Sequence, residues 1–203
     1  MSSLTRRSCL LGLSGLALPA LLPAPARGDP ALREAFLEAA RAQIGVTRIY
    51  DGAYRRLDYP LGDVPAERGV CTDVLVRAYR AIGIDLQVLV HEDMRADFAA
   101  YPPLWGLRAP DRNIDHRRVP NLETFFSRAG ARHPIPREEG GWQPGDLVSM
   151  RLPGNLPHIA IVGDREGPDG VPLVIHNIGR GTEESVCIGL YPLTGRFRYG
   201  LGA

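Results

Sequence analysis

The pattern of apolar residues changes at Trp142, and this change limits the fold more than any other feature of the sequence. Before it, apolar residues recur at helical spacing, which predicts helices over residues 30–44, 71–82, 88–100 and 121–129. After it, short β-prone runs separated by Pro, Gly and Asp predict strands over 146–152, 158–162, 171–176 and 186–191. Helices followed by antiparallel strands are typical of an α+β domain, with the sheet packed against the helix that begins at Cys71.

The first 26 residues have the composition of an export signal. Arg6 and Arg7 precede an apolar, small-residue run that ends in Ala24, Pro25 and Ala26, which resembles an A-x-A cleavage site. Paired arginines suit the twin-arginine route. We expect residues 1–26 to be a signal peptide and residues 27–203 a single periplasmic or otherwise exported domain, without stable membrane contact after cleavage. An uncleaved membrane anchor is the alternative.

Charge excludes several classes of function. The proposed signal carries two arginines and no acid, so its removal takes the formal charge from +1 to −1. A near-neutral chain argues against nucleic acid as a partner. The sequence contains no lysine, which excludes phosphate-loop, Schiff-base and serine–lysine mechanisms.

Cys71 stands at the start of the helix in GVCTDVLVRAYRAIGIDLQ. Val74, Leu75 and Ala78 share its face, so the sulfur is expected to point toward the sheet. The first turn of a helix offers unpaired N–H groups and the positive end of the helix dipole, which lower a thiol pKa and bind an oxyanion. The same position also suits a small apolar residue in a core.

A disulfide is the competing interpretation of Cys71. Cys187 is the other cysteine that remains after removal of the signal, and two cysteines in an oxidising compartment often pair. The chain would then be a non-catalytic periplasmic domain.

Two of the five histidines lie at the ends of apolar strands. His158 begins PHIAIV and His176 ends LVIH. If the two strands pair antiparallel, these side chains are neighbours on one face, as a catalytic base and its orienting partner would be. Two structural histidines whose hydrogen bonds are satisfied in the core fit the same pattern.

The segment 111–118 is rich in charge. Asp111, Asn113 and Asp115 have the first spacings of a calcium loop, but the glycine and closing glutamate are missing. No His and Cys spacing resembles a zinc site, and we expect neither a metal nor a cofactor. His116 and Arg117 belong either to a salt-bridged loop or to the wall of a substrate cleft, where arginine would bind a carboxylate.

The order of these pieces resembles the NlpC-type cell-wall peptidases of the papain-like superfamily. The matching segments are Cys71 with the helix after it, GDLV at 145–148, HIAIV at 158–162 and VIH at 174–176. The resemblance extends to a bacterial group known only as a domain of unknown function, through LDYPLGDVP, GVCTDV, LVHEDM, WGL, PDRNIDHRRVPNL and HNIG. Thr72 and Asp73 stand where NlpC-type members usually have Ser-Gly.

This resemblance implies a papain-like α+β fold and a Cys-His-His triad. Cys71 would be the nucleophile, His158 the base and His176 its orienting partner, with Tyr59 assisting near the oxyanion. It implies an exported, monomeric hydrolase that cleaves an amide bond in peptidoglycan stem peptides or in another peptide. An acyltransferase or N-acyl amidase on the same triad is the alternative enzyme.

Overall fold

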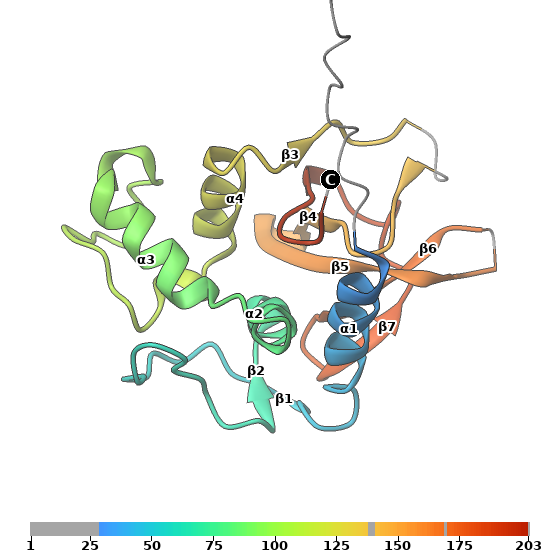
Figure 1. Ribbon diagram of the computed structural model, residues 1–203, viewed down its shortest axis with the longest axis horizontal. Coiled ribbons are helices and arrows are strands. Elements are labelled where there is room, and N and C mark those ends of the chain that lie inside the picture. Colours follow the sequence, from blue (N-terminus) through green and yellow to red (C-terminus); the bar gives the residue numbers. More distant parts are fainter. Residues whose placement is uncertain (1–28, 138–140, 169, 203) are drawn as a thin grey trace, which may run out of the picture.

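The computed structural model describes residues 29–137, 141–168 and 170–202, and in this part helices pack against one face of a sheet (Figure 1). The expected signal peptide, residues 1–26, lies outside the described residues. Within the described part, no helix is both long enough and apolar enough to cross a membrane.

Four α-helices precede the main sheet, and their starts follow from local capping. Asp29 accepts hydrogen bonds from the first turn of α1, and Asp85 accepts one from Gln87 in α3. Helix α2 ends at Ala81, and Gly83, two residues further on, has a φ of +81° that turns the chain away from the helix. The bounds are α1 Pro30–Arg41, α2 Cys71–Ala81, α3 Leu86–Ala96 and α4 Val119–Arg128. All four predicted helices are therefore present, with α1 and α3 shorter at their C-terminal ends than predicted.

The main sheet has six strands in the order β3-β8-β4-β5-β6-β7, and all its pairings are antiparallel. The strands are β3 Arg132–His133, β4 Leu147–Leu152, β5 Leu156–Glu166, β6 Pro172–Asn177, β7 Thr182–Ser185 and β8 Leu193–Phe197. The strand predicted at 186–191 is wrong. Cys187 and Ile188 are buried there in a turn, because Gly189 takes a φ of +87° and reverses the chain.

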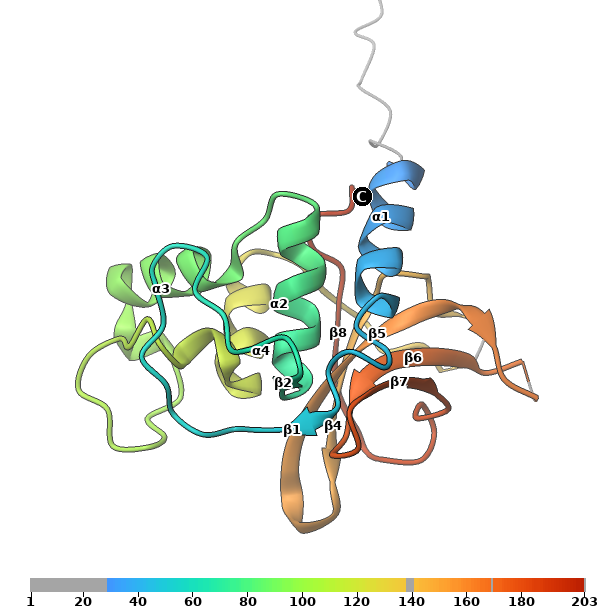
Figure 2. The same ribbon diagram turned by 90° about the horizontal axis from the view of Figure 1, so that it is seen from below.

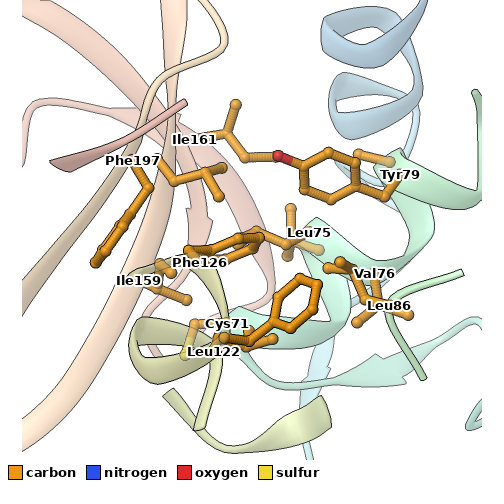
Figure 3. Close-up of a cluster of buried hydrophobic side chains, with 14 of the residues drawn as sticks. Cys71, Leu75, Val76, Tyr79, Leu86, Leu122, Phe126, Ile159, Ile161 and Phe197 are labelled. Carbon is orange, nitrogen blue, oxygen red and sulfur yellow. The ribbon is translucent and has the colours of Figure 1, made fainter. Parts of the chain in front are cut away.

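The sheet separates two apolar cores. Ile159 and Ile161 of β5 face the helices and join the core that contains Cys71, Leu75 and Phe126 (Figure 3). The alternate residues Ala160 and Val162 point to the opposite face, where a smaller core contains Trp142, Met150 and Cys187. Figure 2 shows α2 and α4 on one side of the sheet. Cys71, the first residue of α2, lies in the core between this helix and β5.

A long loop brings residues before Cys71 into a second, two-stranded sheet. Strand β1, Ile49–Tyr50, pairs parallel with β2, Arg68–Gly69, in the register Tyr50 to Gly69. Because Gly69 is two residues before Cys71, this pairing fixes Tyr50 beside the start of α2.

Candidate functional site

The start of α2 is fixed by an acidic cap that follows the cysteine. Val70 is extended, and its N–H donates to Asp73 Oδ2 at 2.7 Å. This closes the first turn of the helix around Cys71. Asp73 stands three residues after Val70, so the sequence alone contained a signal for this cap.

Cys71 lines a cleft of about 400 Å³. The exposed rings of Tyr50, Tyr54 and Trp105 form part of its rim. Other lining residues are Gly52, Val70, Ile114, Arg117, Arg118, Val119, Pro120 and Pro157. Although the cysteine is only 3% exposed, its location on this wall leaves a route from solvent to the sulfur.

Burial gives the Cys71 thiol a higher pKa than the sequence predicted. Removal from water raises the pKa of Cys71 to about 11, and the nearby Asp73 carboxylate adds to the rise. The backbone N–H groups of Ile159, Thr72 and Cys71 act in the opposite direction. The expectation of a low pKa at the helix start is therefore wrong, because desolvation outweighs the helix N-terminus. In the substrate-free protein the sulfur is a neutral thiol.

His158 and His176 are joined by a hydrogen bond, as the strand pairing predicted. His158 Nε2 lies 2.9 Å from His176 Nδ1, and His176 Nε2 lies 2.9 Å from Ser185 Oγ. Both rings are 1% exposed. Burial lowers the pKa of His158 to about 3 and also lowers that of His176. The two histidines are therefore neutral, and Nδ1 is the ring nitrogen of His158 that His176 leaves free.

Cys71 contacts β5 at the point where β5 and β6 separate. The last close pair of this ladder on that side is Ile161 with Ile175, so the N–H of Ile159 is free to point at the Cys71 sulfur. His158 directly precedes this amide. Among the described residues no hydrogen bond joins Cys71 to His158, and strand alternation places His158 on the side of β5 that carries Ala160. Contacts between catalytic groups are often long before substrate binds.

Asn177 ties the end of β6 to the cysteine loop and was not predicted as a site residue. Its side-chain N–H donates to the carbonyl oxygen of Gly69 at 3.1 Å, and the side chain is fully buried. This bond holds β6, and with it His176, close to the approach to Cys71. Only its place directly after His176 could have signalled this role.

Arg117 and His116 do not have the substrate-binding geometry expected of them. Arg117 donates from Nε and Nη2 to both carboxylate oxygens of Asp73, at 2.8 and 2.9 Å, and from Nη1 and Nη2 to the backbone carbonyls of Ala53 and Asp51. His116 is 2% exposed, and burial lowers its pKa to about 3. The structure therefore supports the salt-bridged loop for Arg117, whereas His116 makes no ion pair among the described residues and its buried Nδ1 has no hydrogen-bond partner there.

We expect Arg117→Met to destabilise the fold strongly. Its side chain is 1% exposed and that of Asp73 is 3% exposed, so the substitution leaves a buried carboxylate without its partner, at a cost of about 3–5 kcal/mol. The measurement is the free energy of unfolding in urea. Arg95→Met, which breaks an exposed pair with Glu92, is the matched control and should cost under about 1 kcal/mol. Equal losses in the two variants would contradict the prediction.

Tyr50, and not Tyr59, is the tyrosine beside the cysteine. The Tyr59 hydroxyl donates to Glu92 at 3.2 Å, and its ring packs edge-on against His91, away from the cleft. Tyr50 lines the cleft beside Cys71, and its strand pairs with the two residues that lead to the start of α2. No local sequence pattern indicates that Tyr50 lies there, because its location depends on the parallel pairing of β1 with β2.

The disulfide alternative is also wrong for this structure. Cys71 and Cys187 are both free and buried. They belong to the two cores on opposite faces of the sheet, and Cys187 instead lies 3.4 Å from the sulfur of Met150. A disulfide requires Cα atoms within about 7 Å, which a sheet between the two side chains does not allow.

The acidic segment 111–115 satisfies its own hydrogen bonds. Asp111 Oδ1 accepts from the backbone and side-chain N–H groups of Asn113, and Asn113 Oδ1 accepts from Leu57 N. No group of three or more His, Cys, Asp or Glu side chains with metal-binding geometry occurs in the described part of the chain.

The comparisons with known proteins agree with the extent of this domain. The model of the family described as "Domain of unknown function (DUF1287)" matches residues 37–199. The chain belongs to the DUF1287 family. The match spans Cys71, both strand histidines and Asn177, so the candidate site lies wholly within the DUF1287 region.

One curated relative and one solved structure are similar over most of the chain. Uncharacterized protein YijF of Escherichia coli (strain K12) is 50% identical over 181 residues, which are 89% of this chain and 88% of that protein. A crystal structure of a protein similar to a lipoprotein of the NLP/P60 family, from Staphylococcus aureus subsp. aureus Mu50, is 14% identical with a TM-score of 0.42. It covers 87% of this chain, which spans 44% of that structure.

Proposed function

We propose that this protein is an exported papain-like cysteine hydrolase that cleaves an amide bond. The observation that carries the proposal is the meeting of Cys71 with β5 at the Ile159 amide, next to the hydrogen-bonded chain of His158, His176 and Ser185. A candidate nucleophile and backbone donors for an oxyanion thus lie at the cleft, and the candidate base directly precedes the Ile159 amide in the sequence.

The neutral state of the thiol sets the order of proton transfers. His158 takes the thiol proton at Nδ1 as the sulfur attacks the carbonyl carbon, and backbone N–H groups at the start of α2 hold the oxyanion. The C–N bond then breaks, and His158 returns the proton to the leaving amine. Water resolves the acyl-enzyme by the same general-base step and regenerates the thiol.

The histidine chain supports one consistent set of tautomers. If His158 accepts at Nδ1, its Nε2 carries hydrogen and donates to His176 Nδ1. His176 then carries hydrogen on its own Nε2 and donates to Ser185 Oγ. Because each ring fixes the tautomer of the next, His176 and Ser185 would orient His158 as the third member of a triad does.

Peptidoglycan stem peptides are the substrate that we propose. The predicted export signal and the resemblance of the Cys71, His158 and His176 segments to NlpC-type peptidases support this choice. We place the protein in the periplasm or outside the cell, acting as a monomer. The choice of substrate is an analogy based on family, not a consequence of the site chemistry.

Digestion of purified peptidoglycan tests both the reaction and the substrate. The wild-type protein should release new amino and carboxyl termini, which mass spectrometry of the fragments assigns to one peptide bond, and Cys71→Ala should release none. A product in which the acyl group has moved to another amine would identify an acyltransferase instead. Intact peptidoglycan after prolonged digestion would contradict the proposed substrate.

A further inference from the structure

Arg118 is the second arginine of the cleft that contains Cys71, and its guanidinium is held in place from two sides. The group stacks over the Trp105 ring, 4.1 Å from the ring centroid. Its Nη1 donates to Asp115 Oδ1 at 3.1 Å, and Asp115 is 1% exposed. Unlike Arg117, Arg118 makes no other side-chain hydrogen bond among the described residues, so its Nε and Nη2 donate to none of them, and the residue lines the cleft.

The backbone of Trp105 is strained in the conformation that places its ring on Arg118. Trp105 has a φ of +62°, which is unfavourable for a large side chain, and Gly106 follows at +65°. The indole is 50% exposed, so burial in a core does not account for this conformation. This backbone conformation places the Trp105 ring against the Arg118 guanidinium at the cleft wall, and we attribute the strain to that contact.

The two arginines at this wall differ in how many of their donors are used. Each pairs with one carboxylate, Arg117 with Asp73 and Arg118 with Asp115, but Arg118 uses only Nη1 in its pair. Helix α4 begins directly after Arg118, which adds the positive end of a ten-residue helix dipole on the same side. A guanidinium with two parallel free donors matches a planar carboxylate.

We propose that Arg118, supported by Trp105, binds a carboxylate of the substrate beside the bond that Cys71 attacks, so that the enzyme selects anionic peptides or amides. This proposal rests on the proposed function, since it assigns specificity to the same cleft. The substrate-binding arginine is then Arg118 and not Arg117, because Arg117 donates to both carboxylate oxygens of Asp73.

Affinity alkylation tests this assignment without knowledge of the natural substrate. The probes are N-iodoacetyl derivatives of glycine, β-alanine and γ-aminobutyrate, each compared with its carboxamide. In every case the Cys71 sulfur forms a bond to the methylene carbon of the iodoacetyl group. The carbon–iodine bond breaks, iodide leaves, and the thiol proton passes to solvent. Mass spectrometry of the digested protein assigns the label to Cys71 or Cys187. For each pair of probes, the measured quantity is the ratio of the Cys71 labelling rate with the carboxylate to that with the carboxamide, and the urea-unfolded protein gives its intrinsic value.

We expect folded wild-type protein to favour the carboxylate over the amide by about tenfold or more at one chain length, as for a hydrogen bond to a charged group. Arg118→Gln should bring the ratio close to that of the unfolded chain, and Arg118→Lys should retain part of it. Arg112→Gln is the matched control, because Arg112 also lies over an aromatic ring, that of Tyr59, but outside the cleft. Its ratio should be unchanged.

The outcomes separate the two proposals. Equal labelling of Cys71 by both members of every pair, or an Arg118→Gln ratio equal to wild type, would overturn the role of Arg118 and leave the hydrolase intact. A Cys71 that none of the probes labels would overturn both. If Arg118→Gln fails to fold because Asp115 loses its partner, Trp105→Leu removes the stacking alone and should lower the ratio several-fold; an unchanged ratio would contradict the proposal.

Discussion

Replacement of Cys71 or of His158 by alanine should lower turnover of peptidoglycan fragments by at least about 10³-fold, as for other nucleophile and base residues that act as a unit. The Cys71 variant loses the attacking atom, and the His158 variant loses the group that must accept a proton from a thiol with a raised pKa. His176→Ala should cost less, because it removes orientation and not the base, and Ser185→Ala should cost least.

The matched control is Cys187→Ala. Cys187 is also free and buried, but it lies in the core on the opposite face of the sheet, so turnover should be retained. Thermal midpoints of the Cys71 and His158 variants should stay within a few degrees of wild type. Undiminished turnover in either, or loss of turnover in Cys187→Ala with its fold intact, would refute the catalytic assignment.

Acid should destabilise the protein well before its carboxylates titrate. Burial lowers the pKa of His116 and His158 to about 3 and lowers that of His176. In the unfolded chain a histidine has a pKa near 6.5, so below that pH the unfolded state binds protons that the folded state does not. Each histidine then reduces stability by about 1.4 kcal/mol per pH unit as the pH falls toward its folded pKa.

His116 and His158 together should cost about 4 kcal/mol between pH 7 and pH 5, and His176 adds to the loss in the same direction. This is a large part of the whole stability of a small domain. The test is urea unfolding at intervals across this range. His116→Gln should remove about 2 kcal/mol of the loss, because it deletes one of the buried neutral histidines. This residue has no role in the proposed catalysis. A midpoint that does not move from pH 7 to pH 5 would show that the histidines protonate in the folded state.

Local sequence patterns determined the secondary structure near each candidate residue. The helix at Cys71 followed from apolar spacing and Gly83, and the adjacency of His158 and His176 followed from two strands that one short turn joins. These features depend on residues close together in sequence, where capping, periodicity and turn chemistry act. The strand predicted at 186–191 was wrong for the same reason. Cys187 and Ile188 are buried outside any strand, and a short buried apolar segment has the same composition as a strand.

The rest of the site was decided by the tertiary structure. Asp73 and Arg117 are 44 residues apart and Asn177 and Gly69 are 108 apart, so no local pattern reveals either contact. The same holds for the tyrosine beside Cys71, which is Tyr50 and not Tyr59, because its location depends on the pairing of β1 with β2. The pKa of Cys71 differs most from what the sequence predicted. The sequence shows that this residue lies at a helix N-terminus, but it does not show how deeply the sulfur is buried. The sequence by itself determined which residue types the site contains; packing of distant segments determined which of them meet, and in which charge state.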